Sequence, residues 1–248
     1  MLNYRFISLS VALVSLFTTI FIYYKNLISK PITPEKTSVL TRQKFIEQAQ
    51  DIVIKISTEK TSGSGIVISR ANTIYTIITN RHVIARGNTY QIKTSDNNIY
   101  TGTLVAVSQE DDLAVLQFTS DRQYTTATIN REPLPLGVAL FTAGFSFNSD
   151  QLQITSGTLS LQSFKPLKQG YQLGYTNKIY QGMSGGAIFN SLGEVVGMNG
   201  RSANPIIPVY QYQDESYPSQ ELQQQMRELS WGVPIVKAIA LLSRIEND

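Results

Sequence analysis

The sequence Ile78-Thr79-Asn80-Arg81-His82-Val83-Ile84 contains the only histidine of this 248-residue chain. Two further segments follow it, Asp112-Leu113-Ala114-Val115-Leu116 and Gly182-Met183-Ser184-Gly185-Gly186. A serine hydroxyl is a weak nucleophile at neutral pH, so it needs an imidazole to accept its proton and a carboxylate to orient that imidazole. The three segments supply these groups in the order histidine, aspartate, serine. Because the chain has one histidine, His82 is the one candidate for the base.

Each segment taken alone also has a simpler interpretation. Glycine-rich turns that contain serine are common for conformational reasons. A single histidine beside an apolar run is more often structural, and Asp112 could simply begin a strand. The pattern Gly-x-Ser-x-Gly also occurs in α/β-hydrolases, but there the histidine follows the serine, and none follows Ser184 here. The coincidence of all three segments in this order favours catalysis.

Short segments rich in β-branched residues surround the three motifs. In the first half they are 52–56, 65–68, 73–79, 90–93, 100–107 and 113–118. After a break at 131–135 they are 138–143, 152–155, 157–162, 172–175, 187–189 and 194–198. Short strands at regular spacing predict barrels or a sandwich. We expect two β halves with the site in the cleft between them; the alternative is one large sandwich, in which the three residues need not meet.

Three other segments differ from this pattern. Residues 41–50 are predicted to form a short amphipathic helix. Residues 201–230 look inserted and contain a predicted helix with Leu222, Met226 and Leu229 at helical spacing. This insertion could cover the cleft as a lid or pad the second half. Pro234 opens a predicted C-terminal helix over 235–244, whose apolar stripe indicates docking onto the domain.

Residues 6–24 carry no charge, which is about the length that a helix needs to cross a bilayer. A retained membrane anchor is the preferred interpretation over a cleaved signal peptide, because the apolar run is long and no small-x-small cleavage site follows it. Basic residues on both sides leave the orientation open. We expect an anchor and linker over 1–37, followed by a folded domain over 38–248.

Composition narrows the range of functions. The net charge is +3 and the pI is about 9.0, but the basic residues form no dense block, which argues against a nucleic-acid partner. The chain has no cysteine, so it has no disulfide, no thiolate nucleophile and no cysteine-ligated metal. We expect neither a metal nor a cofactor, and the oligomeric state is open.

The three motifs resemble the triad segments of trypsin-like serine peptidases, and the bacterial HtrA-like branch is the nearer match. The similarity extends from about Val39 to the end of the chain. It implies two six-stranded antiparallel β-barrels, at about 51–130 and 136–233, and a C-terminal helix at about 234–245. It also implies His82 as general base, Asp112 as orienting carboxylate and Ser184 as nucleophile. Asp111 is a rival carboxylate, but the family places the acid directly before Leu-Ala-Val-Leu.

The resemblance further implies that the backbone N–H groups of Gly182 and Ser184 form an oxyanion hole. It implies a substrate pocket lined by Asn177, Lys178, Ile179, Asn199, Gly200 and Arg201. Lys178 and Arg201 could favour acidic substrates or be solvated surface charges. HtrA proteases usually carry a PDZ module after the protease, and we expect none here, since the sequence ends at Asp248.

The activity expected from these features is that of an endopeptidase acting on polypeptides, membrane-anchored with its catalytic domain outside the cytoplasm. The alternative from another class is a catalytically silent trypsin-like domain that binds or scaffolds other proteins. Hydrolysis of non-peptide esters is a weaker third possibility, because nothing in the sequence indicates a lipid-binding pocket.

Overall fold

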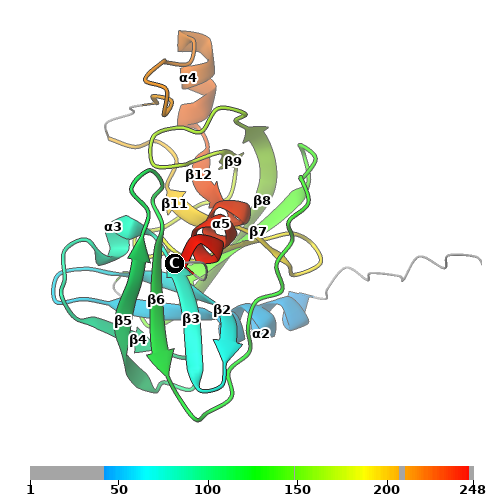
Figure 1. The fold of residues 1–248 in the computed structure, drawn as a ribbon. Helices are drawn as coiled ribbons and strands as arrows, with labels where there is room; N and C mark the ends of the chain where they lie inside the picture. The colour runs from blue at the N-terminus through cyan, green and yellow to red at the C-terminus, as the bar shows by residue number, and fades with distance from the viewer. Residues whose placement is uncertain (1–41, 148, 207–209, 246–248) are drawn as a thin grey trace, which may run out of the picture. The chain divides into compact units, whose positions relative to one another are not determined.

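The computed structural model describes residues 42–147, 149–206 and 210–245. Within these ranges, twelve strands form two closed barrels of six strands each (Figure 1). Neighbouring strands in both barrels pair antiparallel. The expected pair of six-stranded barrels is therefore confirmed, and the single sandwich is wrong.

The expected membrane span over 6–24 and the domain boundary at 37/38 lie outside the described residues, so both stay predictions. Among the helices within the described ranges, none has the length and apolar character needed to span a bilayer.

The first barrel contains the six strands expected in the first half of the chain. Their order around the barrel is β1 (Val53–Ser57), β2 (Ser62–Ala71), β3 (Ile74–Thr79), β6 (Ala114–Thr119), β5 (Ile99–Val107) and β4 (Tyr90–Lys93), which pairs back with β1. Alternate residues of each strand point inward, and Ile54, Ile56, Ile77 and Ile92 are almost completely buried there. β-branched side chains suit this pleated, buried surface.

The second barrel has the order β10 (Ala187–Phe189), β11 (Val195–Arg201), β12 (Ser230–Pro234), β9 (Leu173–Tyr175), β8 (Leu152–Gln162) and β7 (Ala139–Phe145), which pairs back with β10. Leu140, Leu159, Tyr175 and Ile188 fill its interior. The number of strands matches the expectation, but two of the predicted strands are different.

The predicted strands 152–155 and 157–162 form one continuous strand, β8. The predicted break at Ser156 is wrong, because the strand continues through Ser156 into Gly157. A side chain at position 157 would collide with the amide of Asn177. Its glycine is explained by close approach and not by chain reversal. The sixth strand is β12, which was not predicted because it lies between the insertion and the C-terminal helix.

Four helices occur in the described ranges. They are α2 (Arg42–Ile52), α3 (Arg81–Ile84), α4 (Gln220–Arg227) and α5 (Ile235–Ile245). The predicted helices at the start and end of the domain are thus confirmed as α2 and α5, within about two residues. On α2, the ring of Phe45 packs against Phe141 and Phe189 of the second barrel. The helix predicted within 201–230 corresponds to α4, with Ser219 as its N-cap.

The proline-containing connection between the barrels is held to both of them. The N–H of Ala127 donates to the carbonyl of Val67 in β2, and the N–H of Asn130 donates to the carbonyl of Val195 in β11. These backbone hydrogen bonds fix the two barrels against each other, so that loops from both can contribute to one site.

Candidate active site

His82 lies on the short helix α3, which begins directly after β3. Its ring Nδ1 is 2.7 Å from Oδ2 of Asp112, and its backbone N–H donates to Oδ1 of the same carboxylate at 3.0 Å. The side-chain amide of Asn80 donates to the backbone carbonyl of Asp112 at 2.9 Å. The His82 side chain is 45% exposed, whereas the Asp112 side chain is 1% exposed. The structure thus joins two of the three predicted triad residues, with the imidazole facing solvent.

The Asp112 carboxylate is ionised in spite of its burial. Burial by itself favours the neutral acid. The hydrogen bond and charge attraction to His82, together with a hydrogen bond from Tyr171, outweigh this effect and hold the pKa of Asp112 below its usual value of 3.8. With Nδ1 bound to this anion, the other ring nitrogen of His82 is available to accept a proton.

Ser184 and Val83, the residue that follows His82, both lie against β2. Its backbone carbonyl accepts a hydrogen bond from the N–H of Ser64 in β2, at 2.8 Å. A side-chain carbon built on Gly63 would lie 2.7 Å from the Val83 side chain and 3.2 Å from the carbonyl of Ser184. The Ser184 hydroxyl, however, donates to the carbonyl of Gly200 at 3.2 Å. Within the described residues no hydrogen bond joins this hydroxyl to the imidazole.

The backbone around Gly182 is held on both sides. The carbonyl of Gln181 accepts from the N–H of Phe147 at 2.8 Å, and the carbonyl of Gly182 accepts from the Ser64 hydroxyl at 2.9 Å. Gly182 has φ +96°, and a side chain there would collide with the backbone of Phe147. None of the described residues accepts a hydrogen bond from the N–H of Gly182 or Ser184.

The six predicted pocket residues have different environments. Gly200 lies against the ring of Tyr171. Asn177, Ile179 and Asn199 are buried, and the amide groups of the two asparagines donate to backbone carbonyls of the second barrel. Lys178 is exposed, with its ammonium 5.1 Å from the centre of the Tyr180 ring. Arg201 lies over the rings of Tyr171 and Tyr210. The substrate pocket stays a prediction.

Asp111 and Asp112 occupy different environments. Asp111 pairs with Lys237 of α5 at 2.6 Å and accepts from the Gln213 amide at 3.2 Å. Of the two neighbouring carboxylates, the one that contacts His82 is therefore Asp112.

One residue of this site was not predicted. The hydroxyl of Tyr171 donates to Oδ2 of Asp112 at 2.6 Å. Tyr171 is 59 residues away in sequence, in the loop between β8 and β9, and a tyrosine between two predicted strands has no feature that separates it from an ordinary core residue. The contact between Tyr171 and Asp112 can be recognised only in the folded structure.

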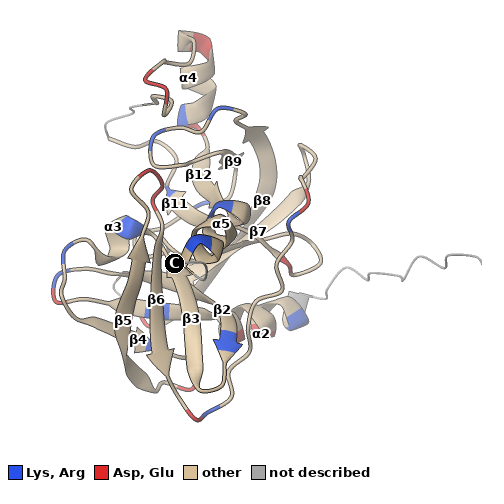
Figure 2. Ribbon diagram, in the orientation of Figure 1, with Lys and Arg blue, Asp and Glu red and all other residues tan. Residues whose placement is uncertain are grey.

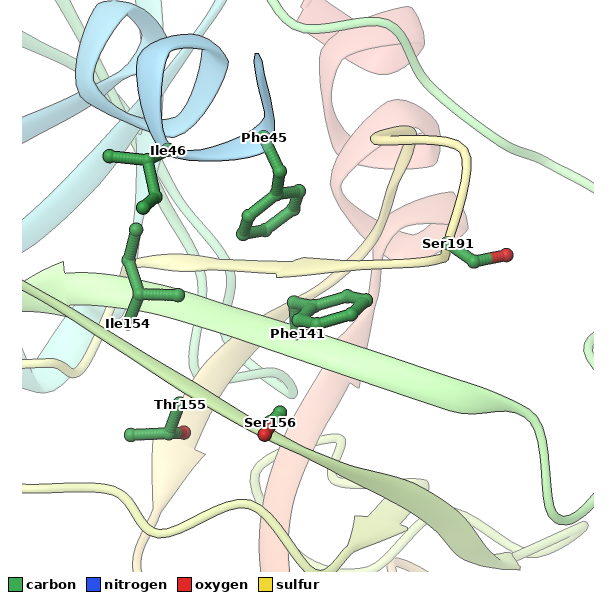
Figure 3. A pocket seen from close by; sticks show the side chains of 7 residues that line it. All are labelled: Phe45, Ile46, Phe141, Ile154, Thr155, Ser156 and Ser191. Atoms are coloured by element: carbon green, nitrogen blue, oxygen red, sulfur yellow. The ribbon is translucent and has the colours of Figure 1, made fainter. Parts of the chain in front are cut away.

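A cavity of about 390 Å³ lies away from these residues, between α2 and the second barrel (Figure 3). Phe45 and Ile46 of α2 face Phe141 of β7 and Ile154 of β8 across it. Figure 2 shows basic and acidic residues interspersed over both barrels of the described chain. The expected absence of a nucleic-acid partner stays a prediction.

Comparison with known proteins agrees with this arrangement. The model of the family "Trypsin-like peptidase domain" matches residues 63–198. The "Serine endoprotease DegS" of Escherichia coli K12 is 32% identical over 144 residues, which cover 56% of this chain and 39% of that protein. A "Probable periplasmic serine endoprotease DegP-like" of Pseudomonas fulva is 30% identical over 139 residues, covering 55% of this chain and 28% of the relative.

The chain thus spans less than half the length of these curated relatives. Among solved structures, the serine endoprotease from Yersinia pestis superposes with a TM-score of 0.65 over 84% of this chain and 68% of that chain. At 22% identity this likeness shows the fold alone. The match of the family model over more than half of the sequence confirms the resemblance noted from the three motifs: the chain belongs to the trypsin-like peptidase domain family.

Proposed function

We propose that this protein is a serine endopeptidase that cleaves polypeptides through an acyl-enzyme intermediate. The observation that carries the proposal is the pair of His82 and Asp112, joined at 2.7 Å, together with Gly63, which lies against both Val83, the residue after His82, and the backbone of Ser184. In this proposal Ser184 is the nucleophile, His82 the general base and Asp112 the carboxylate that holds the imidazole in the required tautomer.

The reaction begins with a rotation of the Ser184 side chain about its Cα–Cβ bond, away from the carbonyl of Gly200 and towards His82. The free ring nitrogen of His82 takes the hydroxyl proton as the oxygen attacks the substrate carbonyl. The imidazolium, stabilised by the Asp112 anion, then returns the proton to the leaving amine. A water molecule activated by the same imidazole hydrolyses the acyl-enzyme and restores the serine.

The proposed oxyanion hole consists of the N–H groups of Gly182 and Ser184. A trans peptide places its C=O and N–H on opposite sides, so the contact from Phe147 to the Gln181 carbonyl directs the Gly182 N–H away from the β7–β8 loop. A donor of this type lowers the barrier by about 3 kcal/mol. The open hydrogen-bonding capacity of both N–H groups supports this role.

The remaining parts of the proposal concern substrate and location. The exposed ammonium of Lys178 and the guanidinium of Arg201 favour acidic side chains in the substrate pocket. Residues 6–24 would anchor the protein in a membrane with the peptidase domain outside the cytoplasm. The relative named as a periplasmic endoprotease supports that location.

A fluorophosphonate probe, which reacts with activated serines, tests the nucleophile. Labelling of the full chain should map to Ser184 and disappear in Ser184→Ala. Ser191→Ala is a matched control, since this serine lines the cavity under α2 and should leave labelling unchanged. Labelling that persists in Ser184→Ala would show that the nucleophile is wrongly assigned.

The second candidate is a trypsin-like domain that binds other proteins without cleaving them. The observation that favours it is the orientation of the Ser184 hydroxyl, which donates to Gly200 and not to His82. Incubation with casein separates the two functions. Fragments that appear with the folded wild type and not with Ser184→Ala support the peptidase; an intact substrate after hours, with no probe labelling, supports the binding module.

A further inference from the structure

The Asp112 carboxylate divides its hydrogen-bonding capacity between two elements. Oδ2 of Asp112 accepts from His82 Nδ1 at 2.7 Å and from the Tyr171 hydroxyl at 2.6 Å, while Oδ1 is taken by the backbone of His82. A hydrogen bond to a carboxylate disperses its negative charge. The donor from Tyr171 therefore weakens the pull of this oxygen on the imidazole proton.

Tyr171 is held in one position by its surroundings. Its side chain is 2% exposed, and its ring lies on the backbone of Gly200, where any side chain would collide with it. The guanidinium of Arg201 lies 5.3 Å from the ring centre. Burial and the neighbouring Asp112 charge raise the pKa of Tyr171 well above its usual value, so the hydroxyl remains a donor.

The loop that carries Tyr171 is attached directly to the Asp112 loop. The N–H of Asp112 donates to the carbonyl of Gln169 at 2.8 Å. Gly170, with φ +81°, lies against the Asp111 carboxylate so closely that a side chain would not fit. One loop thus binds both the backbone N–H of Asp112, through Gln169, and its carboxylate, through Tyr171.

Residues 211–214, within the 201–230 segment, also support this loop. The N–H of Lys168 donates to the carbonyl of Gln211 at 2.7 Å, and the N–H of Gln213 donates to the carbonyl of Pro166 at 2.9 Å. An ion pair of 2.8 Å joins Lys165 to Asp214. Residues 211–214 thus hold the loop that carries Tyr171 in place; we call this contact the brace.

We infer that Tyr171 is a positioning residue for the Asp112–His82 pair, presented by the β8–β9 loop and braced by residues 211–214. The inference rests on the proposed function. By competing with the imidazole for one carboxylate oxygen, Tyr171 limits how strongly Asp112 stabilises the protonated form of His82. It also fixes the carboxylate against rotation, so that the imidazole keeps its alignment during proton transfer.

Tyr171→Phe removes the hydroxyl and keeps the ring. Because His82 is the only histidine, carbon-13-labelled histidine in the full chain, purified through a histidine-free tag, reports its titration as a single NMR signal. The midpoint of this titration should rise by about 0.5 to 1 pH unit in the variant, since the carboxylate gains negative charge density. Arg81 and Asp111 adjoin the pair in sequence, Arg201 lies over the Tyr171 ring and Lys237 pairs with Asp111, and the variant leaves all four in place.

Tyr210→Phe is the matched control. Tyr210 is also buried and lies under Arg201, but its hydroxyl donates to the carbonyl of Met226 and not to Asp112. This variant should leave the His82 titration unchanged. Replacement of Tyr171 by 3-fluorotyrosine, whose hydroxyl is a stronger donor, should move the midpoint in the opposite direction.

Kinetics provide the second measurement. In Tyr171→Phe we expect the acid limb of the kcat/KM profile to move to higher pH with the NMR midpoint. We also expect kcat to fall about 3- to 10-fold with KM nearly unchanged, because substrate contacts are not altered. A purely structural role would lower Tm without moving either pH value.

An unchanged or lowered midpoint in folded Tyr171→Phe would overturn the inference, as would a shift of equal size in Tyr210→Phe. The NMR titration needs no turnover. If the wild type neither cleaves casein nor reacts with the probe, the proposed function fails while the Tyr171 contact is still tested; if cleavage occurs and the midpoint does not move, the reverse holds.

Discussion

The two halves of the candidate site are held in different ways. On the first barrel, three hydrogen bonds of 2.7 to 3.0 Å hold Asp112: its carboxylate binds the ring and the backbone N–H of His82, and its backbone carbonyl accepts from the Asn80 amide. On the second barrel, the backbone of Gly182 and Ser184 is fixed by neighbouring residues, but the reactive hydroxyl points to the carbonyl of Gly200.

The serine side chain is therefore the part of the site that is free to move. The histidine and aspartate cannot change their orientation without breaking charge-assisted hydrogen bonds, which are stronger than neutral ones. The serine hydroxyl is held by one neutral hydrogen bond and turns by rotation about a single bond. The Asp112–His82 pair and the backbone of residues 181–185, called the serine loop below, are therefore already in place before substrate binds. Only the Cα–Cβ torsion of Ser184 has to change.

The largest expected effect comes from breaking the Asp112–His82 pair. In Asp112→Asn the amide favours the wrong tautomer of His82, and kcat should fall about 10⁴-fold, measured with a peptide substrate. Asp111→Asn is the control, because Asp111 contacts Lys237 and Gln213 and not His82. It should cost about 1 to 3 kcal/mol of stability and leave kcat within a few-fold. Equal losses of kcat in the two variants would contradict the assignment of Asp112.

A smaller effect is expected from loosening the serine loop. The hydroxyl of Ser64 donates to the Gly182 carbonyl and accepts from the N–H of Phe145. Ser64→Ala leaves both groups unpaired, which should lower stability by about 1 to 3 kcal/mol and kcat about 10- to 100-fold through misplacement of the Gly182 N–H.

Ser69→Ala is its control, since Ser69 is an exposed serine of the same strand. Thermal unfolding and the rate of probe labelling measure the two effects. If Ser64→Ala labels as fast as wild type, the serine loop keeps its conformation without this contact.

The smallest effect is expected at the far end of the β7–β8 loop. The carboxylate of Asp150 pairs with Lys55 at 2.7 Å and with Lys93 at 2.9 Å, both on the first barrel. Hydrogen bonds and charge attraction from these two lysines lower the pKa of Asp150 to about 2. The stabilisation that the ionised Asp150 carboxylate provides is therefore fully present above pH 4 and is lost as the pH falls towards about 2.

Because Asp150 is exposed, Asp150→Asn should change kcat less than about threefold at low salt, and the difference from wild type should vanish at about 0.5 M salt. Asp121→Asn, another exposed aspartate, should show no salt-dependent difference. A tenfold loss of activity in Asp150→Asn that persists in high salt would contradict this prediction. It would show that the ion pairs of Asp150 with Lys55 and Lys93 affect the site more strongly than exposed ion pairs are expected to.

Local sequence patterns predicted most elements of both barrels. They failed at two places, the continuous strand β8 and the strand β12. Gly157 lies inside β8 because Asn177 approaches it, a reason that no neighbouring residue reveals. The strand β12 is five residues long and contains Trp231, Gly232 and Pro234, so its pairing with β9 and β11 defines it better than its own composition does.

Residue types and their order in the chain predict the chemistry available to this protein: one histidine, followed by an aspartate and a serine in family-typical segments, on two sets of short strands. Residue type and periodicity are local properties, and they can be read from the chain. Folding establishes which carboxylate contacts His82, where the Ser184 hydroxyl points, and that Tyr171 donates to the same carboxylate as His82. These depend on hydrogen bonds between residues that are distant in sequence, and such bonds exist once both barrels have closed and their loops have been packed together.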